Sequence, residues 1–352
     1  MALRDIIGQE KAINILLGTI GKGRIPSAYL FAGEQGIGKK LTAINISKLL
    51  NCQNPQPLTT RPGELPPRSG GFAEENEETN PRSDACDSCP SCKKIDSRTH
   101  PDFLLVEPEK GEIRVDEIRA IEEALSFAPY EGKIKVVVVD DAESMNQSAA
   151  NAFLKTLEEP PAQSLIILVS SSPDRLPETI RSRCSRVNFS PLSPEKCEEV
   201  IKKQGSGVRG QGLEKNNYLS TVSRLSMGRP GLAIANDLIE ERDWFLRLFR
   251  ELTNRSNKET WEDREEIESW FNSAMIFLRD MAVFRITGKP DMLINIDLKD
   301  RIAAVSKTVE LKDIIDSYAK ISFLKRYLEF NLNKSITWNY TGFILEKFGR
   351  GI

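Results

Sequence analysis

A glycine-rich loop between a short apolar run and a helix constrains the fold of this chain more than any other feature. The apolar run Tyr29–Ala32 is typical of a buried strand, and Gly33-Glu-Gln-Gly-Ile-Gly-Lys-Lys40 follows it directly. Glycines at this spacing let backbone N–H groups turn inward around phosphates, and the start of the next helix adds positive potential. The pattern predicts an ATP or ADP site made of Gly33, Gly36, Gly38, Lys39 and Lys40. The alternative is an ordinary glycine-rich turn.

The last position of this loop departs from the usual pattern. A Ser or Thr normally stands there and binds Mg²⁺, whereas this chain has Lys40. An ammonium group has no lone pair to give a cation. Thr42 lies about 200° further round the helix, at ~100° per residue, so it does not take over the role. We therefore do not expect Mg²⁺ at this site.

A second candidate feature is the apolar strand Lys135–Val139, which ends in the carboxylates Asp140 and Asp141. In phosphoryl-transfer sites the first acid positions Mg²⁺ and the next, usually Glu, orients the attacking water. Asp141 is shorter than Glu by about one C–C bond, ~1.5 Å, and a misplacement near 1 Å can cost ~10²-fold in rate. We therefore expect no ATP hydrolysis by this chain alone. The alternative is a strand end capped by solvated acids.

The order of elements predicts an α/β domain followed by helices. Short β-rich runs alternate with helical stretches up to about residue 190, which favours a parallel sheet. The expected strands are Tyr29–Ala32, Phe103–Glu107, Lys135–Val139, Leu165–Ser170 and Arg186–Phe189, and the expected helices include Val115–Phe127 and Ser148–Glu158. We predict an α/β domain over 1–190, a small helical lid domain over 191–240 and a helical collar over 241–352. A glycine-rich break at 205–212 interrupts the lid.

The segment 53–85 differs from the rest of the first domain. Its 33 residues include six Pro and three Gly, with six acidic and three basic side chains. Few apolar groups are available to offset the entropy of ordering, so we expect a mobile surface loop.

Four cysteines flank this segment and predict a structural zinc site. They are Cys52, Cys86, Cys89 and Cys92, and the last three form two overlapping C-x₂-C steps. Four thiolates complete a tetrahedral Zn²⁺ site with no open position for catalysis. Unpaired thiols are one alternative, and His100 in place of Cys52 is another. Cys184 and Cys197 are isolated and are read as buried small hydrophobes.

Composition excludes other classes of protein. Hydrophobic residues are 39% and charged residues 28% of the 352 residues, which is ordinary for a globular chain. Every apolar run is far shorter than the ~20 residues needed to span a bilayer. Arg4 and Asp5 stand where a signal peptide would have its apolar core, so we expect a cytoplasmic protein. With a net charge of −2, nucleic acid must be contacted through a local patch or a partner.

Together these motifs resemble the AAA+ clamp loaders of bacterial DNA polymerase III, and within them the delta-prime type of subunit. The resemblance covers about residues 5–240. It rests on the phosphate loop, the cysteine module and four further segments: Ile7–Glu10, His100–Asp102, Asn146–Pro161 and Ser182–Cys184. From about residue 241 the chain matches only in length and helical character.

The resemblance implies that Arg183 is an arginine finger, which acts in trans on the ATP of a neighbouring subunit. A guanidinium is always protonated and offers forked donors to a γ-phosphate. Read alone, Arg183 would be a solvated arginine at a helix end, and Ser171 a turn residue or a group facing the γ-phosphate. The family's motor subunits also carry an arginine that senses their own nucleotide, and Gly231 stands at that position. Lys40, Asp141 and Gly231 thus indicate a stator that does not turn over ATP.

The implied partners are gamma/tau-type and delta-type subunits of the loader. Through that complex the chain would act on the sliding clamp and primed DNA during DNA replication, as part of the polymerase holoenzyme. One alternative is a gamma/tau-type ATPase motor subunit, a type that tolerates Lys40. Another is a stand-alone zinc-dependent nucleic-acid-binding module, which the balanced charge disfavours.

Overall fold

The computed structural model describes residues 1–57, 83–204, 215–253, 261–330 and 332–349. The backbone forms two compact units, Met1–Lys196 and Cys197–Ile352. The expected glycine-rich break at 205–212 and residues 58–82 of the expected mobile segment lie outside the described residues. The separation of a lid over 191–240 from a collar over 241–352 stays a prediction.

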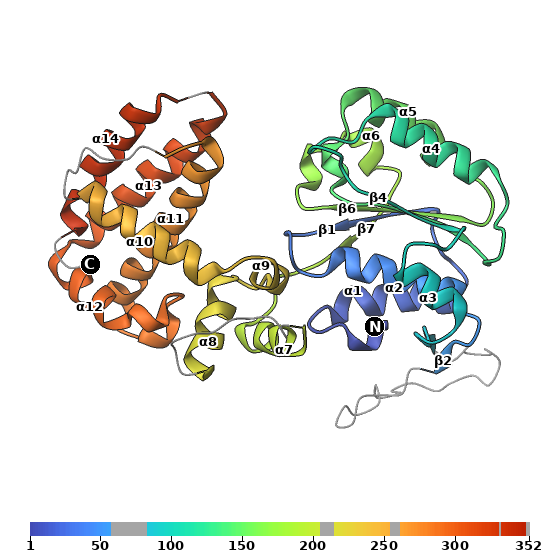
Figure 1. Ribbon diagram of the computed structural model, residues 1–352, viewed down its shortest axis with the longest axis horizontal. Helices are drawn as coiled ribbons and strands as arrows, with labels where there is room; N and C mark the ends of the chain where they lie inside the picture. Colours follow the sequence, from blue (N-terminus) through green and yellow to red (C-terminus); the bar gives the residue numbers. More distant parts are fainter. Residues whose placement is uncertain (58–82, 205–214, 254–260, 331, 350–352) are drawn as a thin grey trace, which may run out of the picture. The chain divides into compact units, whose positions relative to one another are not determined.

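The first unit is built on a five-stranded parallel sheet with the order β4-β5-β6-β1-β7 (Figure 1). These strands are β1 (Ala28–Ala32), β4 (Phe103–Val106), β5 (Lys135–Val139), β6 (Ser164–Ser170) and β7 (Ser185–Asn188). The predicted α/β class with a parallel sheet is confirmed. The strand predicted over Lys135–Val139 is confirmed residue for residue, and the other four differ by one residue at one or both ends.

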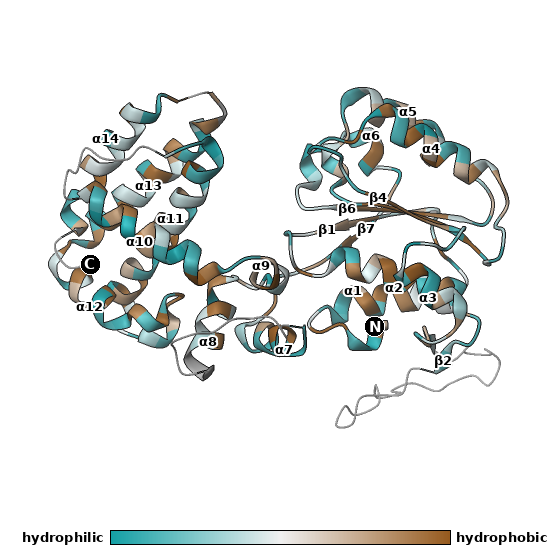
Figure 2. Cartoon of the chain, viewed as in Figure 1, coloured by the Kyte–Doolittle hydropathy of each residue, from teal (hydrophilic) through white to brown (hydrophobic). Residues whose placement is uncertain are grey.

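Helices cover both faces of this sheet (Figure 1). One face carries α1 (Glu10–Gly21), α2 (Lys39–Asn51) and α3 (Pro90–Asp96), and the other carries α4 (Val115–Ser126), α5 (Gln147–Glu158) and α6 (Glu178–Arg181). Side chains alternate along each strand, so Tyr29 and Phe31 pack under the first set while Leu30 packs under the second. Figure 2 shows the resulting apolar strands between helices that are polar on their outer sides.

Short elements join the cysteine segment to this unit. The ends of the predicted mobile segment form a small antiparallel ribbon, β2 (Gln56–Pro57) with β3 (Ser83–Asp84). Buried Asp84 accepts hydrogen bonds from the backbone N–H groups of Leu3 and Arg4, at 3.1 and 2.9 Å. The C-terminal end of the segment is therefore fixed to the N-terminus of the chain. The unit also contains the 3₁₀ turns Leu3–Asp5, Ala142–Ser144 and Pro173–Arg175.

The described part of the second unit is helical. Its α-helices are α7 (Pro194–Gln204, which begins in the first unit), α8 (Lys215–Leu225), α9 (Pro230–Ala235), α10 (Leu238–Thr253), α11 (Arg264–Thr287), α12 (Lys299–Thr308), α13 (Leu311–Tyr327) and α14 (Lys334–Leu345). Its 3₁₀ turns are Pro290–Met292, Ile296–Leu298, Leu328–Phe330 and Glu346–Phe348. Aromatic side chains fill the core, with Trp270 in contact with Phe245 and Trp261. Within the described ranges, no helix is long and apolar enough to cross a membrane.

Candidate functional site

The predicted phosphate loop joins β1 to α2, and its backbone needs glycine. Gly33, Gly36 and Gly38 have φ values of 151°, 78° and 97°. A Cβ atom on Gly33 would lie 2.6 Å from the carbonyl oxygen of Phe189, so the loop can follow this path only with glycine there. Gly38 precedes the first residue of α2, and open space surrounds the position of its missing Cβ. The loop therefore has the form that phosphate binding requires.

Lys39 begins α2 and is buried beneath the loop. Its ammonium donates hydrogen bonds to the carbonyl oxygens of Gly33 and Glu34, both at 2.6 Å. Burial lowers the pKa of Lys39, and the nearby carboxylates of Glu143 and Asp140 oppose that shift. Lys39 makes no ion pair within 4.0 Å in the described part of the chain. Its charge is thus held at the loop, where a phosphate would neutralise it.

Lys40 has different partners. Its ammonium lies 2.8 Å from Oδ2 of Asp140 and also pairs with Oε1 of Glu107. The other carboxylate oxygen of Glu107 accepts a hydrogen bond from the guanidinium of Arg98 at 2.7 Å. Glu107 and Asp140 follow Val106 and Val139, which are paired on neighbouring strands, so both carboxylates reach the same edge of the sheet. Lys40 therefore joins the ends of β4 and β5 to α2.

Asp141 and Glu143 occupy different environments beyond Asp140. Asp141 has a left-handed backbone with φ 45°, and burial together with the charges of Asp140 and Glu143 raises its pKa. Glu143 accepts hydrogen bonds from Ser171, at 2.9 Å from the backbone N–H and 2.5 Å from the hydroxyl. Burial raises the pKa of Glu143, but these hydrogen bonds bring it below its usual value. The candidate Ser171 is thus engaged by a carboxylate of its own chain.

Sequence reasoning missed Glu107 and Glu143 as members of this cluster. Both had a usable signal, because each lies directly after or close to the C-terminal end of a predicted strand. The carboxyl ends of parallel strands meet at one edge, which is where ligand sites form in α/β sheets. The position of an acid at the end of a strand therefore indicated membership of this cluster, which the phosphate-loop motif alone did not.

The four predicted cysteines lie together. The sulfur atoms of Cys52, Cys86, Cys89 and Cys92 are all within 4.8 Å of one another. Four thiolates bound to Zn²⁺ at ~2.3 Å are about 3.8 Å apart, so this cluster has the size of a tetrahedral metal site. Backbone N–H groups point at three of the sulfurs, for example Cys86 N–H at 3.4 Å from Sγ of Cys52. Such N–H···S bonds stabilise thiolates, the form that binds metal.

The cysteines differ in how readily they lose a proton. Burial raises the pKa of Cys86, but hydrogen bonds from Ser88 and from the Cys89 N–H outweigh it and bring the value to about 6. Burial raises the pKa of Cys52 and of Cys92. A bound cation would favour all four thiolates, since a coordinating thiol is deprotonated. The arrangement can hold a metal ion and leaves no ligand position for a substrate.

His100, considered above as a zinc ligand, instead makes hydrogen bonds within the domain. Its Nδ1 accepts from the Asp102 N–H and its Nε2 contacts the Ser91 hydroxyl, both at 3.1 Å. The geometry thus favours Cys52 over His100 as the fourth ligand. Asp102 in turn accepts from the N–H groups of Tyr130, Glu131 and Gly132, at 2.7 to 2.9 Å. The pair fixes the start of β4 and the loop before β5.

The fully buried Lys48 of α2 attaches the cysteine module to the domain. Its ammonium donates to both oxygens of Asp96 at 3.0 Å and to the carbonyl oxygen of Met1 at 2.8 Å, and it pairs with Asp87. Asp87 lies between two of the cysteines, and Asp96 ends α3. The cluster is therefore anchored to the helix that begins at the phosphate loop.

Arg183 lies just after α6, with 35% of its side chain exposed. Its guanidinium contacts Glu158, the last residue of α5, and the carbonyl oxygen of Thr179. The predicted site residues therefore form two groups in this unit. One is the phosphate loop with the acids, and the other is the cysteine cluster. Arg183 pairs with neither group. Its role as a finger stays a prediction.

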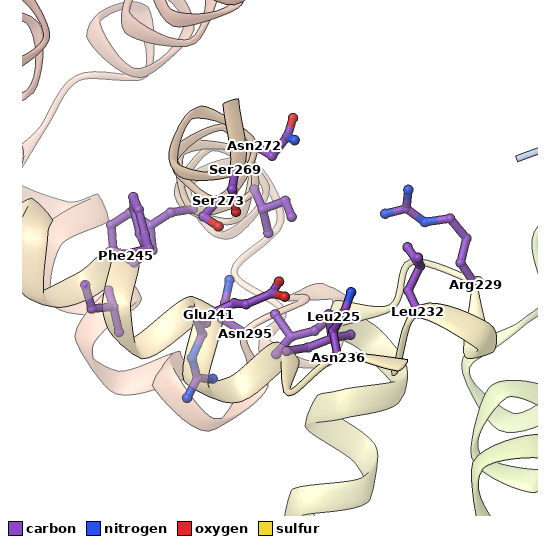
Figure 3. A pocket seen from close by; sticks show the side chains of 15 residues that line it. Leu225, Arg229, Leu232, Asn236, Glu241, Phe245, Ser269, Asn272, Ser273 and Asn295 are labelled. Atoms are coloured by element: carbon purple, nitrogen blue, oxygen red, sulfur yellow. The ribbon is translucent and has the colours of Figure 1, made fainter. Parts of the chain in front are cut away.

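The second unit contains a pocket of about 210 Å³ between its helices (Figure 3). Figure 3 shows Glu241 of α10 and, across the pocket, Ser269 and Ser273 of α11. Burial and Asp237 raise the pKa of Glu241. The pocket contains no residue that the sequence predicted as a site.

Comparison with known proteins finds subunits of DNA polymerase III among the relatives of this chain. DNA polymerase III subunit delta′ of Bacillus subtilis is 26% identical over 335 residues, which are 92% of each chain. Subunit delta′ of Pseudomonas aeruginosa is 35% identical over 184 residues, 52% of this chain and 48% of that one. Subunit gamma of Buchnera aphidicola (Acyrthosiphon pisum) is 32% identical over 199 residues, 56% of this chain and 48% of that one. The chain thus spans about half the length of the last two.

A family profile agrees with these relatives. The profile described as DNA polymerase III, delta subunit, matches residues 8–62 and 71–193, which are just over half of the chain. The match includes the phosphate loop, the acids, all four cysteines and Arg183. The chain therefore belongs to the DNA polymerase III delta-subunit family.

Proposed function

We propose that this chain is a delta-prime-type subunit of the DNA polymerase III clamp loader, a stator that supplies Arg183 to the ATP of a neighbouring subunit. The family match and the Bacillus subtilis relative, which aligns along 92% of both chains, support this proposal. Its partners would be gamma/tau-type and delta-type subunits, with the sliding clamp and primed DNA reached through the complex. The protein would act in the cytoplasm.

The choice of a stator over a motor subunit rests on Lys40 and Asp141 together, because a gamma/tau-type motor tolerates Lys40 by itself. The cation that faces Asp140 is the Lys40 ammonium of the chain itself, so Mg²⁺ does not fit the usual position. Asp141 adds a short acid where hydrolysis needs a longer carboxylate, and burial together with the charges of Asp140 and Glu143 raises its pKa. An incomplete hydrolytic site in a chain that also carries an exposed arginine is what a stator requires. The gamma/tau-type alternative, favoured by the gamma and tau relatives, requires hydrolysis in this chain.

We propose that the cysteine cluster holds one structural Zn²⁺. The ligand set of four thiolates fits zinc, because tetrahedral sulfur sites of this size select it. Bound zinc would crosslink the end of α2 to the turn at residues 86–92, which stabilises the segment between them. The residues would hold the metal without exposing it to a reactant.

The test of the proposed function is Arg183→Ala in a reconstituted loader. We expect the subunit to fold and assemble, because Arg183 is exposed and its partners lie at the surface. ATP hydrolysis by the complex should fall only in part, since other sites keep their own fingers, while clamp loading on primed DNA should fall more. A finger contributes ~10³–10⁵-fold at the site it serves.

Two further measurements interpret that result. Arg183→Lys should rescue poorly, because an ammonium lacks the planar fork of donors. The matched control is Arg181→Ala, another arginine of the same turn, which pairs with Asp174 and should leave loading unchanged. If the Arg183→Ala complex assembles and loads clamps at the wild-type rate, Arg183 is only a surface charge.

A further inference from the structure

The ammonium of Lys40 occupies the place where phosphate-loop sites hold a cation. In those sites the hydroxyl at this position binds Mg²⁺, and the acid at the end of the neighbouring strand positions the same ion. Here Nζ of Lys40 lies 2.8 Å from Asp140 and contacts Glu107 with another of its protons. Two carboxylates and one ammonium thus form a closed group at this edge of the sheet.

Mg²⁺ would have to compete with Lys40 for the carboxylates of that group. The ion requires close to six oxygen ligands at ~2.0–2.1 Å and usually keeps several waters. One Asp140 oxygen already accepts from Lys40, and the second carboxylate, Glu107, is shared with Arg98. A divalent cation would have to displace a positive charge that both carboxylates hold in place. The side chains therefore replace the metal.

The loop nevertheless keeps the means to bind phosphate. Lys39 remains on the loop carbonyls with no carboxylate ion pair within 4.0 Å in the described part of the chain. Two lysines stand at the N-terminus of α2, so the loop keeps the charge of Lys39 and has the Lys40 ammonium where other loops have a metal ion. The glycine backbone that would surround the phosphates is intact.

We propose that the Lys40 ammonium is the built-in cation of this phosphate loop, so that the loop binds a nucleoside di- or triphosphate without Mg²⁺. This inference rests on the nucleotide site that the sequence predicts, and not on the proposed role of Arg183. The bound nucleotide would be a structural ligand, since Lys40 takes the position of the metal-binding hydroxyl and Asp141 that of a longer second acid.

The experiment measures the affinity for ADP by titration calorimetry, in buffer with excess MgCl₂ and again with excess EDTA. For the wild-type chain we expect the dissociation constants to agree within about twofold. Lys40→Thr should make binding at least about tenfold weaker in EDTA than in MgCl₂, because the position then carries a hydroxyl that depends on the metal. Lys40→Arg keeps the charge and should keep binding independent of metal.

Controls separate this inference from folding and from the proposed function. Lys11→Thr removes an exposed lysine of α1 and should behave as the wild type. Lys39→Ala should abolish binding in both buffers. Wild-type binding that needs Mg²⁺, or no ADP binding in either buffer, overturns the inference. Neither result affects the interpretation of the Arg183 experiment, because that experiment measures hydrolysis of ATP that is bound to another subunit.

Discussion

The guanidinium of Arg183 forms an ion pair with Glu158 of its own chain, with 2.5 Å between Nη2 and Oε1. A second donor, Nη1, lies 2.8 Å from the carbonyl oxygen of Thr179. A finger that serves a neighbouring subunit must exchange this carboxylate for a phosphate. Because the ion pair is exposed, this exchange costs little free energy: such pairs contribute only ~0.2–1 kcal/mol to stability.

Glu158→Gln therefore tests whether the pair competes with the partner. Removal of the competing charge should raise the ATPase rate of the reconstituted loader by up to about fivefold, which corresponds to ~1 kcal/mol. Steady-state hydrolysis by the complex measures the effect, with Glu159→Gln as the control on the adjacent acid. A large drop would instead mean that Glu158 orients the arginine.

Zinc content gives a second prediction. The purified chain should hold about one Zn²⁺, and Cys89→Ala should release it, since three thiolates bind far more weakly than four. Elemental analysis of protein prepared under reducing conditions measures this. Cys197→Ala, a buried cysteine of the helical unit, should retain the metal. Wild-type protein without zinc would contradict the proposal.

The isolated chain should show negligible Mg²⁺-dependent ATP hydrolysis. Lys40→Thr alone should not restore it, because Asp141 remains short and carries a raised pKa. A sensitive phosphate-release assay measures the rate, and Lys39→Ala reveals any contaminating ATPase. Robust turnover that vanishes in Lys39→Ala would establish the motor alternative.

We expect the carboxylate of Asp102 to make a pH-dependent contribution to the free energy of unfolding. Burial raises the pKa of Asp102, but three backbone N–H donors outweigh it and hold the pKa below 3.8. A lowered folded-state pKa stabilises the fold above the unfolded value, and this stabilisation is lost as pH falls through the folded value. Asp102→Asn should cost ~1.5–3 kcal/mol near neutral pH, and the difference from wild type should shrink below about pH 4.

Urea unfolding followed by far-ultraviolet circular dichroism measures that difference. The chain offers an internal control, because its four tryptophans, Trp244, Trp261, Trp270 and Trp338, all lie in the helical unit. Tryptophan fluorescence should therefore report the same unfolding midpoint for both proteins if the units unfold independently. A constant difference from pH 7 to about pH 3 would contradict the assigned role of the Asp102 charge.

The sequence by itself determined the strands, the phosphate loop and the cysteine cluster. Apolar runs bounded by polar turns placed the strands within one residue, because the central strands β1, β5 and β6 are buried on both faces and tolerate little else. The glycines and cysteines were equally recognisable, since a left-handed backbone favours glycine and closely spaced cysteines are typical of a metal site.

Only the tertiary structure decided which charges meet. Glu107 and Asp140 are 33 positions apart and become neighbours because β4 pairs with β5, and Lys40 reaches both from α2. Arg183 meets Glu158 because α5 and α6 pack together, and His100 is committed to Ser91 and Asp102. Local patterns fix elements through backbone and burial preferences, whereas ion pairs act over a few ångströms and depend on how distant segments are placed.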